Sequence, residues 1–241
     1  MQNRNFLTRY IPNFITLLSL TSGFTSIRFS LINEWKIAVY LILIFSIFDF
    51  FDGWFARKLK EGSNFGAELD SLSDFVSFGV APSILIFLWS TSSLGSIGWA
   101  GTLFFVICAA LRLARFTADI YITNKPIDHN EYFTGVPSPA AAGLILLPLF
   151  IHFEFTTLII KNEYFNLFNT LIIGFLMISK IPTISLKKIN FNKKFNTWLF
   201  LISVIIFIFL ISKLWLTLTF LFSVYVLSIF FTVYKSRQIK S

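Results

Sequence analysis

The sequence predicts an all-α protein that crosses a membrane several times. Of its 241 residues, 56% are hydrophobic, 13% are charged and 32 are phenylalanine. The charged share is about half of that found in soluble domains. Mean hydropathy is +0.75. Apolar runs of about 20 residues, long enough as helices to cross a hydrocarbon layer of roughly 30 Å, recur along the chain. These observations together predict a polytopic helical membrane protein.

Eight apolar segments are expected to span the membrane. The fifth and sixth are short, and only two residues separate the last two, so this last pair could merge or re-enter. In chain order the predicted spans are Pro12–Leu31, Trp35–Arg57, Ser71–Trp89, Ser96–Phe116, Pro139–Phe153, Phe165–Ser179, Thr197–Ile211 and Leu214–Tyr234.

The basic residues indicate the orientation of these spans. Of the 20 lysines and arginines, 16 fall on one side of the layout, Lys36, Lys161 and Lys213 fall on the other, and Arg28 lies inside the first span. Because cytoplasmic loops carry the excess of Lys and Arg, both termini are predicted to be cytoplasmic. The net charge of +8 then belongs to a surface that faces anionic membrane lipids, and no nucleic-acid partner is expected.

Acidic residues concentrate at the cytoplasmic junction of the second and third spans. The segment 49–74 holds six of the 12 acidic residues of the chain. Helical spacing places Asp49 and Asp52 on one face of the second span, and Asp70 and Asp74 on one face of the third. A short connection makes the two helices antiparallel neighbours, and small residues between the acids allow a close approach. The four carboxylates are therefore expected to converge.

Converging carboxylates at a membrane boundary repel one another and lose hydration, so they either take up protons or bind cations. No histidine or cysteine lies in the segment, which favours hard divalent ions, Mg²⁺ or Mn²⁺. Four carboxylates suit two metal ions, an arrangement that stabilises the attacking and leaving oxygens of a phosphoryl displacement. A solvated, charge-rich helix–loop–helix is the alternative, which the interleaved small residues disfavour.

The segment matches the pattern D-x2-D-G-x2-A-R-x8-G-x3-D-x3-D and so resembles the CDP-alcohol phosphatidyltransferase family. The resemblance implies a six-helix core around a cytoplasm-facing polar cavity, usually in a homodimer. It divides the chain into a core of residues 1–182 and a part of residues 183–241 with a basic loop and two additional helices. The eight matching positions are Asp49, Asp52, Gly53, Ala56, Arg57, Gly66, Asp70 and Asp74.

The resemblance also implies roles for individual residues. Asp49, Asp52 and Asp70 would bind the metal ions, and Asp74 would both bind metal and act as the general base. The donor would be CDP-diacylglycerol, and its CDP part would contact Gly53, Arg57 and Ser63. The segment "PNFIT" resembles the entry to the first helix of the family, which makes Asn13 and Thr16 candidate nucleotide contacts; a polar helix start explains these two residues nearly as well.

Two further segments bear on the acceptor. "ALRLARF" (110–116) and "FTGVPSPAAAG" (133–143) resemble the phosphatidylserine synthases of the family, which implies L-serine as the acceptor. Thr117 stands where these relatives usually have asparagine. Of Arg112 and Arg115, one could pair with the carboxylate of serine and the other with a lipid phosphate, unless both extend to lipid headgroups. Ser138 is expected to cap the fifth span, and its hydroxyl could serve helix or substrate.

Two alternatives stay open at the level of the sequence. A phosphatidylglycerophosphate or phosphatidylinositol-phosphate synthase shares the eight-position pattern. A divalent-cation transporter would use intramembrane acids as its pathway, but it would place them near the bilayer midplane. His129 is the next candidate for the general base if Asp74 does not serve.

Overall fold

The computed structural model describes residues 6–59, 64–123, 132–179, 181–184 and 193–238. The elements are almost all helical, which confirms the predicted all-α membrane fold. The helices are α1 Phe6–Leu31, α2 Trp35–Leu59, α3 Asn64–Asp74, α4 Ala81–Trp89, α5 Ser96–Thr123, α6 Ser138–Phe155, α7 Glu163–Ile178, α8 Lys193–Ser212 and α9 Leu214–Gln238. A π-helical turn, Phe75–Val80, joins α3 to α4, and 3₁₀ turns cover Thr91–Leu94 and Leu158–Lys161.

Eight apolar segments of these helices match the eight predicted spans in order. Five are long and apolar enough to cross a membrane, namely Asn13–Leu31, Trp35–Phe55, Phe65–Trp89, Ser96–Arg115 and Ser138–Phe155. Three are shorter, namely Glu163–Ile178, Leu201–Ser212 and Leu214–Ile229. The chain is an integral membrane protein.

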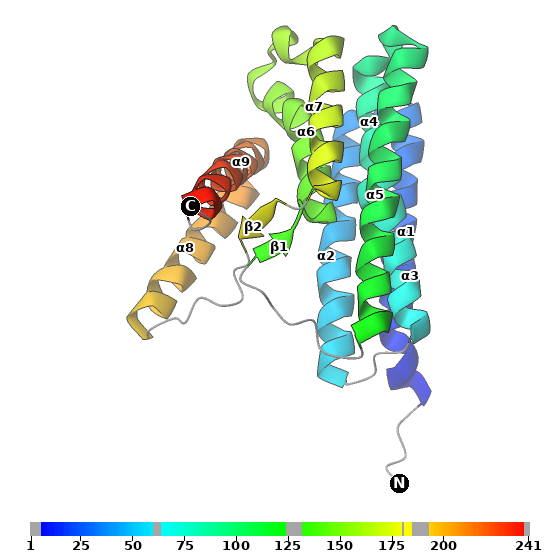
Figure 1. The fold of residues 1–241 in the computed structure, drawn as a ribbon, viewed down its shortest axis with the longest axis vertical. Coiled ribbons are helices and arrows are strands. Elements are labelled where there is room, and N and C mark those ends of the chain that lie inside the picture. Colours follow the sequence, from blue (N-terminus) through cyan, green and yellow to red (C-terminus); the bar gives the residue numbers. More distant parts are fainter. Residues whose placement is uncertain (1–5, 60–63, 124–131, 180, 185–192, 239–241) are drawn as a thin grey trace.

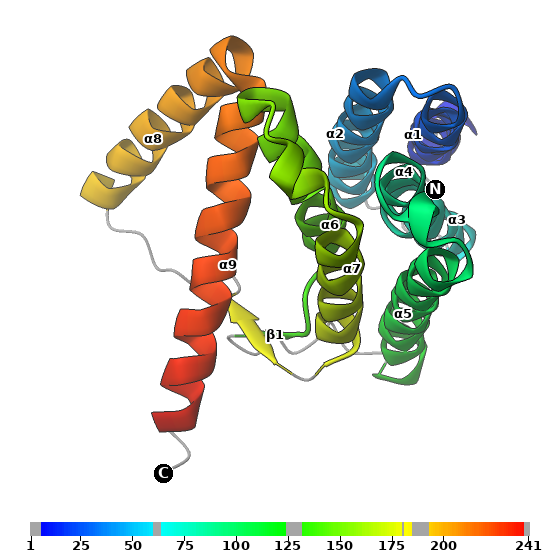
Figure 2. The ribbon, with the colours of Figure 1, turned by 90° about the horizontal axis from the view of Figure 1, so that it is seen from above.

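The first five helices run side by side along the long axis of the molecule, and α6 and α7 separate them from the α8–α9 pair (Figure 1). Figure 2 looks nearly along α1 and α5, whereas α8 and α9 are seen from the side in it. The α8–α9 pair is therefore strongly inclined to α1 and α5. Apolar side chains of α1, α2, α4, α5, α6, α7 and α9 pack together in one large cluster. Its fully buried members include Val39, Leu85, Phe105, Ile145, Leu149 and Met177.

The last helix is packed into this core through aromatic side chains. The ring of Trp215 on α9 lies 4.7 Å from that of Phe153 and 5.2 Å from that of Tyr40, measured between centroids. A Cβ atom on Gly143 of α6 would overlap the ring of Phe222, so the glycine permits the close approach of α6 and α9. The division of the chain after residue 182 stays a prediction, but α9 shares the hydrophobic cluster of the preceding helices.

A short antiparallel ribbon closes one side of the bundle. Strand β1 (Tyr132–Thr134) pairs with β2 (Pro182–Ile184), and Phe133 lies opposite Thr183. Gly135 follows β1 with φ +78°, a conformation that L side chains rarely adopt. Its N–H donates to the carbonyl of Ile181 at 2.9 Å. The ribbon thereby fixes the segment that leads into α6.

The helices that carry the acids extend beyond the predicted span ends. The second span was expected to end at Arg57 and the third to begin at Ser71, whereas α2 continues to Leu59 and α3 begins at Asn64. Asp49 lies about ten residues before the end of α2, and Asp74 lies about ten residues after the start of α3. Each distance corresponds to roughly 15 Å along the helix axis. The acids therefore lie deeper in the bundle than the sequence suggested.

Candidate functional site

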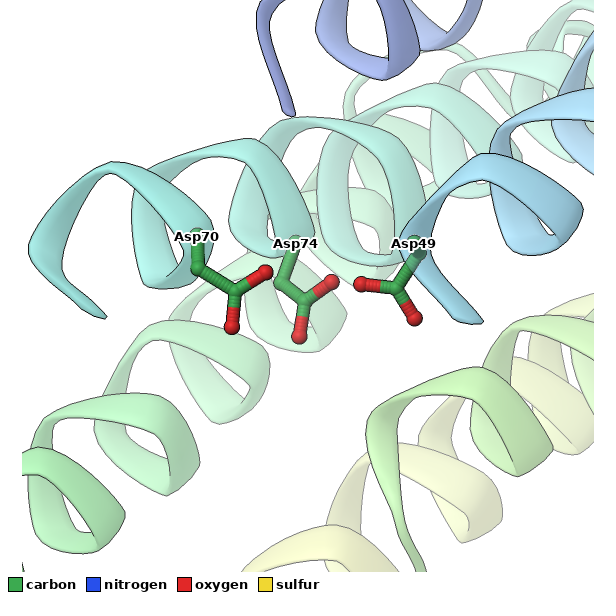
Figure 3. Close-up of side chains that lie close together, drawn as sticks. All are labelled: Asp49, Asp70 and Asp74. Atoms are coloured by element: carbon green, nitrogen blue, oxygen red, sulfur yellow. The ribbon is translucent and has the colours of Figure 1, made fainter. Parts of the chain in front are cut away.

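Three carboxyl groups converge where α2 passes α3. One oxygen from each of Asp49, Asp70 and Asp74 lies within 4.8 Å of the others. Figure 3 shows Asp70 and Asp74 side by side on α3, with Asp49 reaching toward them from α2. Residues four apart share a helix face, which accounts for the first two, and antiparallel packing brings the third. All three side chains are half-buried, and we call them the carboxylate cluster.

Asp52, the fourth predicted metal ligand, faces α1 and lies outside the carboxylate cluster. It is 4% exposed and accepts a hydrogen bond of 2.7 Å from Thr16 Oγ1. Asp52 still interacts electrostatically with Asp49 and Asp70. The Thr16 contact ties α1 to α2 beside the cluster, so the structure gives Thr16 a positioning contact. A metal-binding role for Asp52 stays a prediction.

The carboxylate cluster suits a hard divalent cation. Its ligand atoms are all carboxylate oxygens, the donor type that Mg²⁺ and Mn²⁺ prefer. Asp74 Oδ1 is buried, and no hydrogen-bond partner for it exists among the described residues. An unpaired buried carboxylate oxygen is unfavourable because desolvation is not compensated. A cation bound by Asp49, Asp70 and Asp74 would remove that cost, so the residues present fit a metal ion.

The π-helical turn begins directly after Asp74 and alters the packing there. Ser77 lies on this turn, fully buried, with its side chain against Gly23 of α1. A Cβ on Gly23 would overlap Ser77, so only glycine permits this contact. Single π turns inside α-helices occur frequently at functional sites. Here the turn carries the chain from the carboxylate cluster into α4.

Arg112 of α5 binds the start of α6. Its Nε donates to the carbonyl of Val136 at 2.6 Å, and its Nη1 donates to Ser138 Oγ at 3.1 Å. Arg112 also interacts electrostatically with Asp74, so the guanidinium belongs to the surroundings of the carboxylate cluster. The predicted helix cap was wrong. Pro137 is extended and precedes α6, whose first residue is Ser138, and the Ser138 hydroxyl accepts from Arg112.

Arg115 takes a different direction from Arg112. Its Nη1 donates to the carbonyl of Ile178, the last residue of α7, in a long contact of 3.4 Å. The two arginines are three residues apart, but only Arg112 is joined to Ser138.

Further along α5, the hydroxyl groups of Thr117 and Ser71 lie 3.4 Å apart. Thr117 therefore links α5 to α3 next to Asp70.

Tyr225 of α9 was not predicted as a site residue, although it interacts electrostatically with Arg112. Its hydroxyl is buried and has no hydrogen-bond partner among the described residues. One signal could have found it, because tyrosines of membrane proteins gather at span ends and Tyr225 lies in the middle of an apolar span.

Comparison with known proteins decides the family. The sequence model of the CDP-alcohol phosphatidyltransferases matches residues 9–234, which is nearly the whole chain and includes α8 and α9. The chain belongs to the CDP-alcohol phosphatidyltransferase family. The resemblance inferred from the eight-position pattern is thereby confirmed.

Several curated relatives carry the same name, CDP-diacylglycerol–serine O-phosphatidyltransferase. The protein of Helicobacter pylori (strain ATCC 700392 / 26695) is 33% identical over 223 residues, which cover 92% of this chain and 86% of the relative. That of Methanocaldococcus jannaschii is 35% identical over 215 residues, covering 89% and 91%. That of Mycobacterium leprae is 37% identical over 172 residues, 71% of this chain. The chain spans only 57% of that relative and 50% of the Mycobacterium tuberculosis proteins.

The remaining residues implied by the family pattern are only partly described. Gly53 lies half-buried on α2, and Asn13 lies half-buried on α1, one turn before Thr16. Arg57 lies on α2, but its side chain is outside the described part of the structure. Ser63 and His129 also lie outside the described residues. Donor contacts by Asn13, Gly53, Arg57 and Ser63 stay predictions, as does the role of His129 as the alternative base.

Proposed function

We propose that this phosphatidyltransferase moves the phosphatidyl group of CDP-diacylglycerol to the hydroxyl of L-serine. The products are phosphatidylserine and CMP. Relatives that cover most of the chain are named for this reaction. The observation that carries the proposal is the position of Arg112, joined to Ser138 and close to Asp74. When the hydroxyl of a serine approaches the carboxylate cluster, the carboxylate of that serine would contact the guanidinium of Arg112.

Divalent cations, two Mg²⁺ or Mn²⁺ ions, would be held by Asp49, Asp70 and Asp74, with Asp52 as the fourth ligand. When bound, they supply charge neutralisation at the pyrophosphate and at the departing CMP. The all-oxygen donor set and the unpartnered Asp74 Oδ1 support this assignment.

Asp74 is proposed to be the general base as well. A carboxylate beside the bound cations can take the proton of the serine hydroxyl. The new bond joins the serine oxygen to phosphorus, and the bond between phosphorus and the CMP oxygen breaks. The proton passes to Asp74. Arg112 holds the acceptor by its carboxylate, since a planar guanidinium can donate two parallel hydrogen bonds to it.

The donor is proposed to bind on the side of α1 and α2. Gly53, Arg57 and Ser63 would contact the CDP part, together with Asn13 and Thr16. Because the Thr16 hydroxyl already donates to Asp52, its contribution includes fixing that carboxylate. The lipid tails of CDP-diacylglycerol would remain among membrane lipids. We further propose a homodimer in a bacterial-type inner membrane, with the site and both termini facing the cytoplasm.

The test is an acceptor assay with the purified full-length chain. CMP release from CDP-diacylglycerol is measured in Mg²⁺ or Mn²⁺ with serine, glycerol 3-phosphate or inositol phosphate as the acceptor. We expect release with serine alone. Release with either phosphate acceptor but not with serine would overturn the serine assignment and retain the transferase. No release with any acceptor, together with divalent-cation flux in proteoliposomes, would favour the transporter.

A further inference from the structure

The hydroxyl group of Tyr225 is a buried polar group for which the described residues provide no hydrogen-bond partner. The ring of Tyr225 packs against the hydrophobic core. A phenylalanine would make the same apolar contacts without burying an unpaired hydroxyl. The hydroxyl is therefore available to a group that is bound during function.

The surroundings of Tyr225 indicate the charge of that group. Tyr225 and Arg112 interact electrostatically, and Arg112 interacts in the same way with Asp74. The bonds of Arg112 to Val136 and Ser138 use two of the five N–H groups of a guanidinium. The other N–H groups and the Tyr225 hydroxyl are donors in one neighbourhood. Such a set of donors binds an anion, and a carboxylate matches it best because it can accept from both.

We propose that Tyr225 is an acceptor-recognition residue, whose hydroxyl donates a hydrogen bond to the carboxylate that Arg112 binds. This inference rests on the proposed function, because the carboxylate is that of L-serine. It assigns a role to α9, which otherwise contributes apolar packing to α6. The acceptor is then held between α5 and α9 while its hydroxyl points toward Asp74 on α3.

The test compares Tyr225→Phe with the unchanged chain in serine and CDP-diacylglycerol titrations. The substitution keeps the ring and removes only the hydroxyl. Loss of a hydrogen bond to a charged group is expected to raise the serine KM about tenfold. The KM for CDP-diacylglycerol and the melting temperature should remain near those of the unchanged chain. A structural role would not produce this split between the two substrates.

The matched control is Thr219→Val on the same helix. The Thr219 hydroxyl is also buried without a described partner, but it lines an apolar groove of about 550 Å³ between α8 and α9. We expect wild-type kinetics for Thr219→Val.

A second test combines Tyr225→Phe with Arg112→Lys. Two residues that bind one carboxylate should show a combined effect on the serine KM that differs from the product of the single effects.

The outcomes separate the two proposals. If the unchanged chain uses serine and Tyr225→Phe keeps its serine KM, the role of Tyr225 is overturned and the proposed function stands. A lower melting temperature with an equal loss toward both substrates would show a packing role and would also overturn it. If the unchanged chain does not use serine, the proposed function fails first.

Discussion

Two buried polar sites, in different parts of the bundle, differ in how they are satisfied. Near the ends of α4 and α6, the side chain of Asn166 is 0% exposed. Its Nδ2 lies 3.0 Å from Ser90 Oγ, 2.9 Å from the carbonyl of Ile160 and 2.9 Å from that of Asn162. The Ser90 hydroxyl in turn donates to the carbonyl of Lys161. We call this set the Asn166 network.

The carboxylate cluster has the opposite character. Its members are ionisable carboxyl groups, and Asp74 Oδ1 has no partner among the described residues. The Asn166 network also contains one unpaired atom, Asn166 Oδ1, but that group is neutral and its amide nitrogen is fully engaged. Buried polar groups that bond one another hold loops to helices, whereas buried charges without partners require a ligand. The difference predicts where substitutions affect chemistry and where they affect folding.

Removing divalent cations should have the largest effect. Because the carboxylate cluster needs positive charge, CMP release should fall to background in EDTA and return with Mg²⁺ or Mn²⁺. The same cations should raise the melting temperature of the unchanged chain, since a ligand that binds only the folded state stabilises it. Asp49→Asn should lose most of that shift. Full activity in chelator would contradict the metal assignment.

Asp74→Asn should come next in size. The amide cannot take a proton, so turnover is expected to fall at least about 100-fold, while binding of CDP-diacylglycerol remains measurable by titration. Glu163→Gln is the matched control, because it removes an acidic group from the first turn of α7, beside the Asn166 network. It should keep normal turnover. Near-normal turnover of Asp74→Asn would move the base elsewhere, with His129 the next candidate.

The sequence predicted the convergence of Asp49, Asp70 and Asp74 because their geometry is local. Asp52, which was expected to converge with them, accepts from Thr16 of α1 instead. Asp70 and Asp74 share a face by helical period alone, and the short connection from α2 brings Asp49 to them. The eight apolar segments were predictable for the same reason, since each depends only on neighbouring residues. The positions of the acids were predicted less well, because α2 and α3 continue past the apolar runs that marked the spans.

Other parts of the site depend on contacts between distant segments. Ser77 on the π-helical turn after Asp74 packs against Gly23 of α1, a contact that no local pattern of α3 encodes. The bond from Arg112 to Ser138 forms because the β1–β2 ribbon fixes the chain before α6. The sequence analysis expected the Ser138 hydroxyl to cap the helix, whereas in the structure it accepts a hydrogen bond from Arg112. Tyr225 reaches Arg112 only through the packing of α9 on α6.

The two arginines of α5 offer a third prediction, on substrate affinity. Arg112→Lys keeps the positive charge but loses the planar fork that bonds Val136 and Ser138, so the serine KM should rise about tenfold. Arg115→Lys should change it less, because Arg115 makes only a long contact with the end of α7. The KM for CDP-diacylglycerol, measured in the same assay, should move little in Arg112→Lys. Equal serine kinetics in both variants and in the unchanged chain would remove serine recognition from this face of α5.

The smallest effect is expected at the Asn166 network, and it should fall on stability. Asn166→Ala removes the amide that joins Ser90 to the turn before α7, and it leaves the carbonyls of Ile160 and Asn162 without this donor. Hydrogen bonds between membrane helices contribute about 1 kcal/mol each or less, because the unfolded chain also finds partners in the membrane. The melting temperature in detergent should therefore fall by a few degrees. The serine KM and the turnover of the folded protein should not change, since the network shares no residue with the carboxylate cluster. Thr170→Val is a matched control on the same helix, because the Thr170 hydroxyl only donates to the carbonyl of Asn166 within α7, and it should lower the melting temperature less. A kinetic defect in Asn166→Ala without loss of stability would show that the two sites are coupled, and the contrast between a structural and a chemical site would then be wrong.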